Sequence, residues 1–166
     1  GASVDYVASR GEYLNGLLLA DYLGFTFLDA AELICFHSDG TYDDETTQQW
    51  TQRLETQQSV VVPGFYGRKR DGSIKTLSRG GSDITGSIVA RAVQADVYEN
   101  WTDVSGFLMA DPRIVDNPKV MRTVTYAELR ELSYMGATVL HEDSIFPVRR
   151  AKIPINVRNT NAPDEP

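Results

Sequence analysis

The stretch Ser59-Val60-Val61-Val62-Pro63-Gly64 decides the fold class of this chain. Three consecutive valines predict a strand buried on both faces, a pattern that is typical of parallel sheets covered by helices. Proline and glycine directly after the valines favour a turn, so the strand is expected to end there. The amphipathic residues 45–58 precede the strand and predict a helix.

Strand and helix patterns alternate on both sides of this stretch. Upstream, the leucines of residues 13–23 predict a largely buried helix that ends at Gly24, where glycine favours a left-handed cap. Downstream, Asp71-Gly72 between two short strand-like segments predicts a hairpin. Other strands are expected over residues 25–28, 96–101 and 153–157, and other helices over residues 30–36, 84–95, 125–135 and 144–151. This alternation predicts an α/β domain with a mainly parallel sheet.

Length and composition are those of one ordinary globular domain. The chain has 166 residues, of which 42% are hydrophobic and 23% are charged. Residues 1–158 are expected to belong to this domain, and the polar, proline-containing residues 159–166 are expected to begin a linker. The apolar runs are much shorter than the roughly 20 residues that span a bilayer. The N-terminus has no secretory pattern, so no membrane partner is expected.

Cysteine content and charge narrow the function classes. Cys35 is the only cysteine, which excludes a disulfide framework and favours a cytoplasmic location. Within the apolar residues 33–36 it is expected to be a small buried hydrophobic side chain rather than a catalytic thiol. The net charge of −7 argues against a nucleic-acid partner, because phosphate backbones require a basic face. An anionic substrate would need local cations: particular Arg or Lys side chains, helix N-termini or a metal ion.

The most informative candidate site is Arg79-Gly80-Gly81-Ser82-Asp83, at the start of a predicted helix. Two adjacent glycines allow close approach of a ligand to the backbone, and the amides of the first helical turn attract an anion. The planar guanidinium group of Arg79 is suited to bind a carboxylate or a phosphate. No Lys-Ser or Lys-Thr follows the glycines, so this is not a Walker P-loop. The alternative is a plain Gly-Gly turn capped by Ser82 or Asp83.

A second candidate site is Trp101-Thr102-Asp103-Val104-Ser105-Gly106, at the carboxyl end of a predicted strand. Ligands of open α/β sheets bind at this edge, where Thr102 and Asp103 could contact a nucleotide or its metal. Asp111 and Arg113 add an acid and a base in the next loop. Each of these residues could equally serve turn chemistry.

The third candidate is Ser9-Arg10-Gly11-Glu12, with Glu12 expected in the first turn of its helix. A carboxylate there is either a partner of the helix dipole or a group that recognises an ammonium or hydroxyl of a substrate. His37 and His141 have no neighbours at metal-ligand spacing, so no protein metal site is expected.

Taken in order, these stretches resemble the aspartate kinases of the amino-acid kinase family. The resemblance covers nearly the whole chain in register. The matching stretches are Ser9-Arg10-Gly11-Glu12, Leu77-Ser78-Arg79-Gly80-Gly81-Ser82-Asp83, Trp101-Thr102-Asp103-Val104-Ser105-Gly106, Asp111-Pro112-Arg113 and Gly136-Ala137-Thr138-Val139-Leu140-His141.

The resemblance implies a three-layer α/β/α sandwich, a homo-oligomer, and transfer of the γ-phosphoryl group of ATP, with Mg²⁺, to the β-carboxylate of L-aspartate. Arg79 and Asp83 would be catalytic, and the substrate would be held by Glu12, Arg79, Gly80, Gly81 and Ser82. The nucleotide would be contacted by Thr102, Asp103, Leu108, Arg113, Thr138 and Val139. The product feeds synthesis of lysine, threonine and methionine.

Three features depart from the family pattern. The Lys-Phe-Gly-Gly segment of the first strand has no counterpart, so residues 1–158 are expected to be a partial catalytic domain with little activity alone. Thr138 stands where relatives often have lysine, and Leu108 stands where some have tyrosine. The regulatory ACT domains that usually follow are also without a counterpart. Two alternatives stay open: another amino-acid kinase, such as an acetylglutamate or uridylate kinase, and a non-catalytic binding or assembly module.

Overall fold

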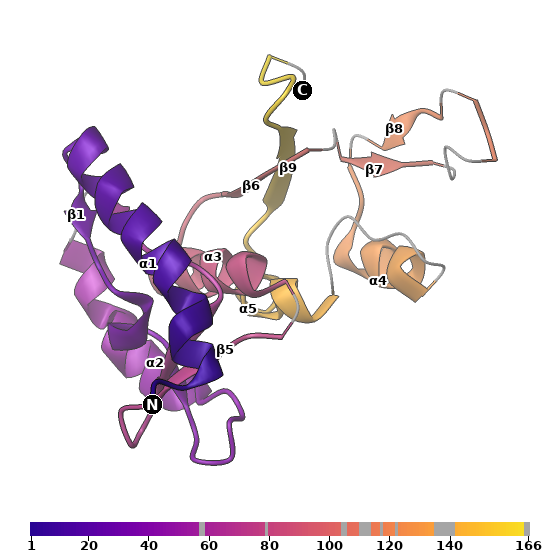
Figure 1. Cartoon of the computed structure of the whole chain (residues 1–166). Coiled ribbons are helices and arrows are strands. Elements are labelled where there is room, and N and C mark those ends of the chain that lie inside the picture. The colour runs from indigo at the N-terminus through magenta and orange to yellow at the C-terminus, as the bar shows by residue number, and fades with distance from the viewer. Residues whose placement is uncertain are drawn as a thin grey trace.

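The computed structural model describes residues 1–56, 59–78, 80–103, 106–109, 114–116, 118–121, 123–134 and 142–164 (Figure 1). The helices are α1 (Val4–Leu23), η1 (Ala30–Glu32), α2 (Asp44–Thr51), η2 (Gln52–Thr56), α3 (Gly81–Ala92), α4 (Tyr126–Tyr134), η3 (Glu142–Ile145) and α5 (Phe146–Ala151). The strands are β1 (Thr26–Phe27), β2 (Cys35–Phe36), β3 (Val60–Val61), β4 (Tyr66–Lys69), β5 (Ile74–Thr76), β6 (Tyr98–Thr102), β7 (Phe107–Leu108), β8 (Val120–Met121) and β9 (Ile155–Asn159).

The strands pair in short sheets that are mainly parallel. β1 pairs with β3, β2 with β4 and β6 with β9, all in parallel, whereas β4–β5 and β7–β8 are antiparallel. The α/β class and the parallel pairing of the valine strand are therefore confirmed. The valines themselves are half-buried rather than fully buried. The hairpin at Asp71-Gly72 is also confirmed, with Gly72 in the left-handed region at φ 89°.

Residues 30–36 do not form the predicted helix. A short 3-10 helix ends at Glu32, and Cys35–Phe36 form β2, which lies parallel to β4. Both β2 residues are buried, and a short apolar run of this kind has no periodicity that separates a strand from a buried helix. The expected burial of Cys35 is confirmed.

Helix α1 differs from the prediction at its start and on its outer face. It begins at Val4, because the Ser3 side chain accepts a hydrogen bond from the Tyr6 amide and caps the helix. Glu12 therefore lies in the middle of α1 and not in its first turn, which rules out a role as a dipole partner there. The leucines are also more exposed than predicted, with exposed fractions of 57% for Leu14 and 71% for Leu18. The C-cap at Gly24, with φ 68°, is confirmed.

Helix α3 lies at the centre of the molecule (Figure 1). Its residues pack in two apolar clusters. Ala90 packs in one cluster with Leu129, Ile145, Val148 and Ile153, and Ile88 packs in the other with Leu33, Ile34, Phe36 and Leu54. Because apolar burial on two sides fixes the helix, the position of its N-terminus is also fixed.

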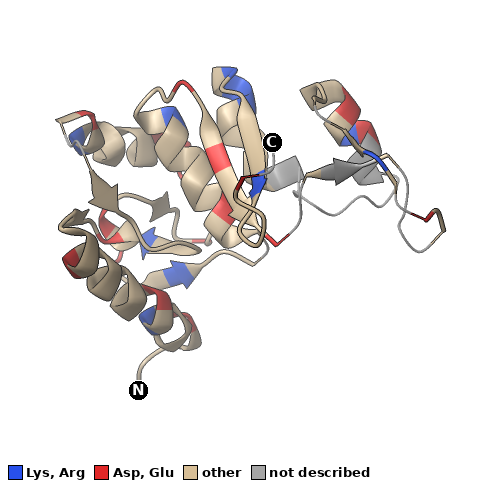
Figure 2. Ribbon diagram, turned by 90° about the horizontal axis from the view of Figure 1, so that it is seen from above, with Lys and Arg blue, Asp and Glu red and all other residues tan. Residues whose placement is uncertain are grey.

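Ion pairs add a second level of organisation. Asp43 is almost fully buried, caps α2 by accepting from the Thr46 amide, and pairs with Arg70 at 2.7 Å. Asp44 pairs with Arg91 of α3 and Arg150 of α5. Acidic and basic residues are interspersed over the elements drawn in Figure 2. None of the helices in the described ranges has both the length and the apolar character of a membrane span.

Replacing Gly67 by alanine should destabilise the fold. A Cβ at Gly67 would stand 2.5 Å from the carbonyl oxygen of Ile34, which is backbone and cannot turn away. We expect Gly67→Ala to lower the free energy of unfolding by about 1–3 kcal/mol. The control is Gly11→Ala, which enters open space in α1 and should raise that free energy by about 0.5–1 kcal/mol. Urea denaturation measures both, and a shift of the same sign in the two variants would contradict the packing argument.

Asp43 should make stability depend on pH in acid. The hydrogen bond from the Thr46 amide, followed by those from the Arg70 and Thr46 side chains, lowers the pKa of Asp43 to about 2. An unfolded aspartate titrates near pH 4, so this stabilisation is complete above about pH 4 and is lost as the pH falls to about 2. Asp43→Asn should be less stable at pH 7 and should lose less stability over that interval. Denaturation midpoints from pH 2 to 7 test this, with the exposed Asp21→Asn as control; parallel curves for Asp43→Asn and the wild type would refute it.

Candidate functional site

The first turn of α3 begins at a glycine. Gly80 is the N-cap in the left-handed region (φ 54°, ψ 29°), and no side chain of the described residues caps the helix. A Cβ at Gly80 would stand 3.2 Å from the Ser144 Cβ, so a larger residue would also crowd η3. The N-cap is therefore Gly80 and neither Ser82 nor Asp83. Amides of a first helical turn have no partner within the helix and can attract an anion, and an anion site at this turn stays a prediction.

The Pro63–Phe65 segment packs directly under this turn. A Cβ at Gly81 would stand 2.6 Å from the Phe65 Cβ, and a Cβ at Gly64 would stand 3.1 Å from the Ser82 Cα. Phe65 has φ 62°, an unfavourable conformation for a bulky residue. Its amide donates to Thr85 Oγ1 (3.1 Å), and the Thr85 hydroxyl donates to the Gly81 carbonyl (2.9 Å). Thr85 thus ties this segment to the first turn of α3.

Helix α1 reaches the same segment from another side. A Cβ at Gly16 would stand 3.4 Å from the Pro63 Cβ, and Glu12 lies one turn before Gly16 along α1. Residues four apart share one side of a helix, so Glu12 and Gly16 are neighbours on α1. Pro63 and Gly64 are adjacent in the chain, and Gly64 contacts Ser82. Glu12 itself is exposed, and Ser82 contacts the segment at Gly64.

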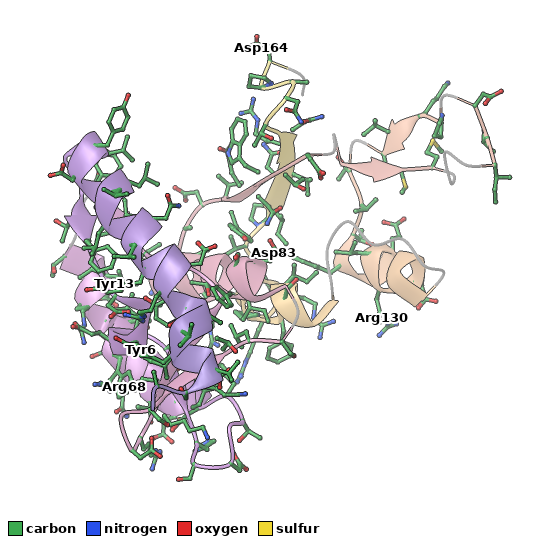
Figure 3. All side chains as sticks on the ribbon, viewed as in Figure 1. Tyr6, Tyr13, Arg68, Asp83, Arg130 and Asp164 are labelled. Carbon is green, nitrogen blue, oxygen red and sulfur yellow. The ribbon has the colours of Figure 1, made fainter. Side chains whose placement is uncertain are left out.

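Asp83 joins α3 to β6. Its Oδ1 accepts a hydrogen bond from Asn100 Nδ2 at 2.8 Å, and its backbone carbonyl accepts one from the Tyr98 hydroxyl at 3.3 Å. Figure 3 shows Asp83 at the start of α3, beside the β6–β9 pair. Side chains two apart on a strand share a face, so Thr102 lies on the same face of β6 as Asn100. The described residues 80–83 of the first candidate site and 101–103 of the second are thus neighbours in space.

The end of β6 carries exposed oxygen atoms. The Thr102 hydroxyl donates to Asp103 Oδ1 at 3.2 Å, and the Asp103 side chain is exposed. Thr160 donates through both its amide and its hydroxyl to the Thr102 carbonyl, which anchors the chain just after β9. Among the described residues, no group of three or more His, Cys, Asp and Glu side chains gathers as a metal site.

A cavity of about 190 Å³ lies elsewhere. It is lined at the C-terminal end of α3 by residues such as Ile88, Arg91 and Gln94, and by Thr47 and Gln48 of α2. Because α3 has 12 residues, its two ends are about 18 Å apart. This cavity is therefore separate from the candidate site.

The structure places the predicted site residues in three groups. Gly80, Gly81, Ser82 and Asp83 lie next to β6, which ends at Thr102 directly before Asp103, and Glu12 lies on α1 one turn before Gly16, the residue that approaches Pro63. Leu108 lies in β7, paired with Val120. Arg79, Arg113, Thr138 and Val139, with the neighbouring Asp111, lie outside the described residues. Their roles stay predictions.

Four residues that shape this site were missed: Phe65, Thr85, Tyr98 and Asn100. Asn100 could have been found, because asparagine is uncommon inside strands and stands within the predicted strand 96–101. It is buried, and so requires hydrogen-bond partners. Burial raises the pKa of Tyr98, so its hydroxyl stays protonated and able to donate. Phe65 and Thr85 carry no comparable signal in the sequence.

Comparison with known proteins identifies the family. Residues 2–159 match the model of the amino acid kinase family, and the chain belongs to that family. It is 40% identical over 169 residues to aspartokinase 3 of Bacillus subtilis, covering 96% of this chain and 37% of that protein. It is also 40% identical to aspartokinase 1 of the same organism, covering 97% of this chain and 42% of that protein. The chain thus spans about two fifths of the length of these relatives.

Solved structures agree with this assignment. The chain superposes on Clostridium acetobutylicum aspartate kinase with a TM-score of 0.95 and 59% identity, covering 100% of this chain and 38% of the other. Against Escherichia coli aspartokinase III in complex with aspartate and ADP, the TM-score is 0.85 at 30% identity, covering 96% and 38%. The expected fold and the resemblance to aspartate kinases are confirmed. Uridylate kinase of Archaeoglobus fulgidus, at 22% identity and a TM-score of 0.61 over 96% of this chain and 65% of the other, shares the fold alone.

Removing the Thr85 hydroxyl should loosen the segment under the site. Thr85 is buried, and Thr85→Val keeps its shape but leaves the Phe65 amide without its acceptor. We expect a loss of about 1–3 kcal/mol in the free energy of unfolding, the cost of one unsatisfied buried donor. Thr85→Ser keeps the oxygen and is the matched control. Equal losses in the two variants, measured by urea denaturation, would show that the methyl group matters and the hydrogen bond does not.

Proposed function

We propose that this chain belongs to an aspartate kinase, which transfers the γ-phosphoryl group of ATP to the β-carboxylate of L-aspartate. One observation carries this proposal: the uncapped first turn of α3 lies beside both the Pro63–Phe65 segment and the end of β6. An anion held at that turn would have Glu12 on one side and Thr102 and Asp103 on the other. The similarity to aspartokinases over nearly the whole chain supports the same function.

The chemistry suits such a site. An aspartate side chain has a pKa near 3.9, so the acceptor is already ionised at neutral pH and needs no general base. One of its oxygens forms a bond to the γ-phosphorus while the bond from that phosphorus to the bridging oxygen breaks, which gives 4-phospho-L-aspartate and ADP. The obstacle is repulsion between a carboxylate and a polyanion. Catalysis is therefore mainly positioning and charge neutralisation.

The substrate is assigned to the α3 side of the site. The Gly80, Gly81 and Ser82 backbone supplies amides, the Arg79 guanidinium group supplies a positive charge, and Asp83 lies beside them. Glu12 is the carboxylate that would hold the substrate ammonium. This division gives each charged group of aspartate a partner of opposite polarity, which a chain of net charge −7 has to provide locally.

The nucleotide is assigned to the β6 side. Thr102 and Asp103 would lie along it, together with Leu108, Arg113, Thr138 and Val139. The exposed Asp103 carboxylate and the Thr102 hydroxyl are oxygen ligands of the kind that Mg²⁺ prefers. Bound Mg²⁺ would neutralise phosphate charge.

The wider setting follows from the same assignment. The product would enter lysine, threonine and methionine synthesis in the cytoplasm. A homo-oligomer is proposed as well, supported by the exposed apolar side chains along α1, among them Leu14, Leu18 and Tyr22.

Calorimetry on the chain tests the proposal. With Mg²⁺ and a non-hydrolysable ATP analogue present, L-aspartate should bind, and N-acetylglutamate and UMP should not. Arg79→Ala should weaken aspartate binding about 10–100-fold, the value of a charge-assisted hydrogen-bond pair. The control is Arg130→Ala, an exposed residue of α4 far from the site (Figure 3). Selective binding of UMP or N-acetylglutamate would indicate another amino-acid kinase. If none of the ligands binds, a non-catalytic assembly module would be favoured.

Activity is tested by grafting. The 166 residues would replace the matching segment of the Clostridium acetobutylicum aspartate kinase, which superposes closely. The chimera should form ADP only when aspartate is present, in a coupled assay. A chimera that folds but shows no aspartate-dependent ADP formation would contradict the proposed function.

A further inference from the structure

Asp83 stands where an acidic residue would normally cap α3. With Gly80 as N-cap, Asp83 is the third residue of the helix. An acidic or amide side chain at this position commonly folds back to accept a hydrogen bond from the N-cap amide. Here Asp83 Oδ2 lies only 3.6 Å from the point where a Cβ at Gly80 would stand, so the carboxylate is close enough to do this. The helix nevertheless has no side-chain cap among the described residues.

The Asp83 carboxylate is held toward β6 instead. Asn100 Nδ2 donates to Asp83 Oδ1 at 2.8 Å and to the Tyr98 hydroxyl oxygen at 3.1 Å. The Tyr98 hydroxyl in turn donates to the Asp83 carbonyl. The carboxylate and the backbone carbonyl of Asp83 are therefore both hydrogen-bonded to side chains of β6. Asn100 is only 7% exposed, which means that its amide cannot exchange these partners freely for water.

Tyr98 itself is fixed by close packing on α3. A Cβ at Gly86 would stand 2.6 Å from the Tyr98 hydroxyl oxygen and 2.8 Å from its Cε2. Glycine in a helix interior is destabilising, and here it allows the Tyr98 ring to lie against the helix backbone. The network of Asp83, Tyr98 and Asn100 is thus fixed by the packing of the Tyr98 ring on Gly86 as well as by hydrogen bonds.

We propose that Asn100 and Tyr98 are positioning residues that hold the Asp83 carboxylate away from the N-terminal amides of α3 and so keep those amides open for an anionic substrate. The inference rests on the proposed function, because it assigns the open amides to the carboxylate of an amino acid. Without Asn100, Asp83 would swing back and occupy the amides as an internal competitor. It would place a negative charge where the substrate anion has to bind.

A double-mutant cycle in the 166-residue chain tests this proposal. Asn100→Leu removes the donor and nearly keeps the volume. It should weaken L-aspartate binding about ten-fold, the effect of losing one hydrogen-bonding position to a competitor. Affinity for the ATP analogue should change by less than about two-fold, as expected for a site with no shared partner. In an Asp83→Ala background, Asn100→Leu should have no further effect on aspartate binding, because the competitor is gone. Asn156→Leu, an exposed asparagine on the adjacent strand β9, is the matched control.

Hydrogen exchange of the Gly80 and Gly81 amides gives a readout that needs no ligand. These amides should exchange more slowly in Asn100→Leu than in the wild type, because Asp83 caps them. Faster exchange, or an equal loss of affinity for both ligands, would mean a merely structural role and would overturn the proposal. An undiminished effect in the Asp83→Ala background would overturn it too.

The proposed function and this inference fail in different ways. If the wild type binds no aspartate, the function is wrong, and the exchange rates still decide whether Asn100 controls the capping of α3. If Asn100→Leu does not fold, Tyr98→Phe replaces it, since it removes one acceptor and one donor from the network. Tyr98→Phe should slow exchange at Gly80 in the same direction, and unchanged exchange would overturn the proposal.

Discussion

The contact between Gly81 and Phe65 is the constraint on which the site depends. Only a hydrogen atom separates the α3 backbone at Gly81 from the Phe65 side chain, since a Cβ there would stand 2.6 Å from the Phe65 Cβ. Phe65 faces α3 with a positive φ, and Thr85 stabilises that conformation by accepting the hydrogen bond of the Phe65 amide. The close approach brings the first turn of α3 over the Pro63–Phe65 segment. The polar edge of the site is then completed by Asp83 and β6.

In the proposed site, an anion would be bound through fixed dipoles more than through net charge. At a net charge of −7, the molecule as a whole repels a carboxylate or a triphosphate. The amides of an uncapped helix N-terminus provide a local positive potential that needs no mobile cation. This positive potential depends on the neighbouring oxygen atoms, because one carboxylate turned toward the amides would cancel it. The orientation of Asp83 is therefore as important to this site as the glycines.

The sequence predicted the architecture better than the details of the site. Valines 60–62 and Asp71-Gly72 have strong local preferences, and the parallel strand and the hairpin were both found. Residues 30–36 and the start of α1 were assigned wrongly, because an apolar run without periodicity and a cap at Ser3 are weak signals. The leucines of α1 fit a buried helix by composition, and burial is a property of tertiary contacts that composition does not contain. Phe65, Thr85 and Tyr98 matter through contacts between distant segments, so no local pattern could reveal them.

The packing of Tyr98 on Gly86 restricts the order in which this sequence can diverge. A larger residue at 86 is compatible with the helix only after the ring at 98 has become smaller, because the two occupy the same space. The smaller residue would also lack the hydroxyl that binds Asn100 and the Asp83 carbonyl. A substitution at Gly86 is thereby coupled to the hydrogen bonds of β6 with Asp83, because it first requires a smaller residue at position 98. An intermediate sequence would lack the Tyr98 hydroxyl and would still have a glycine in the helix interior.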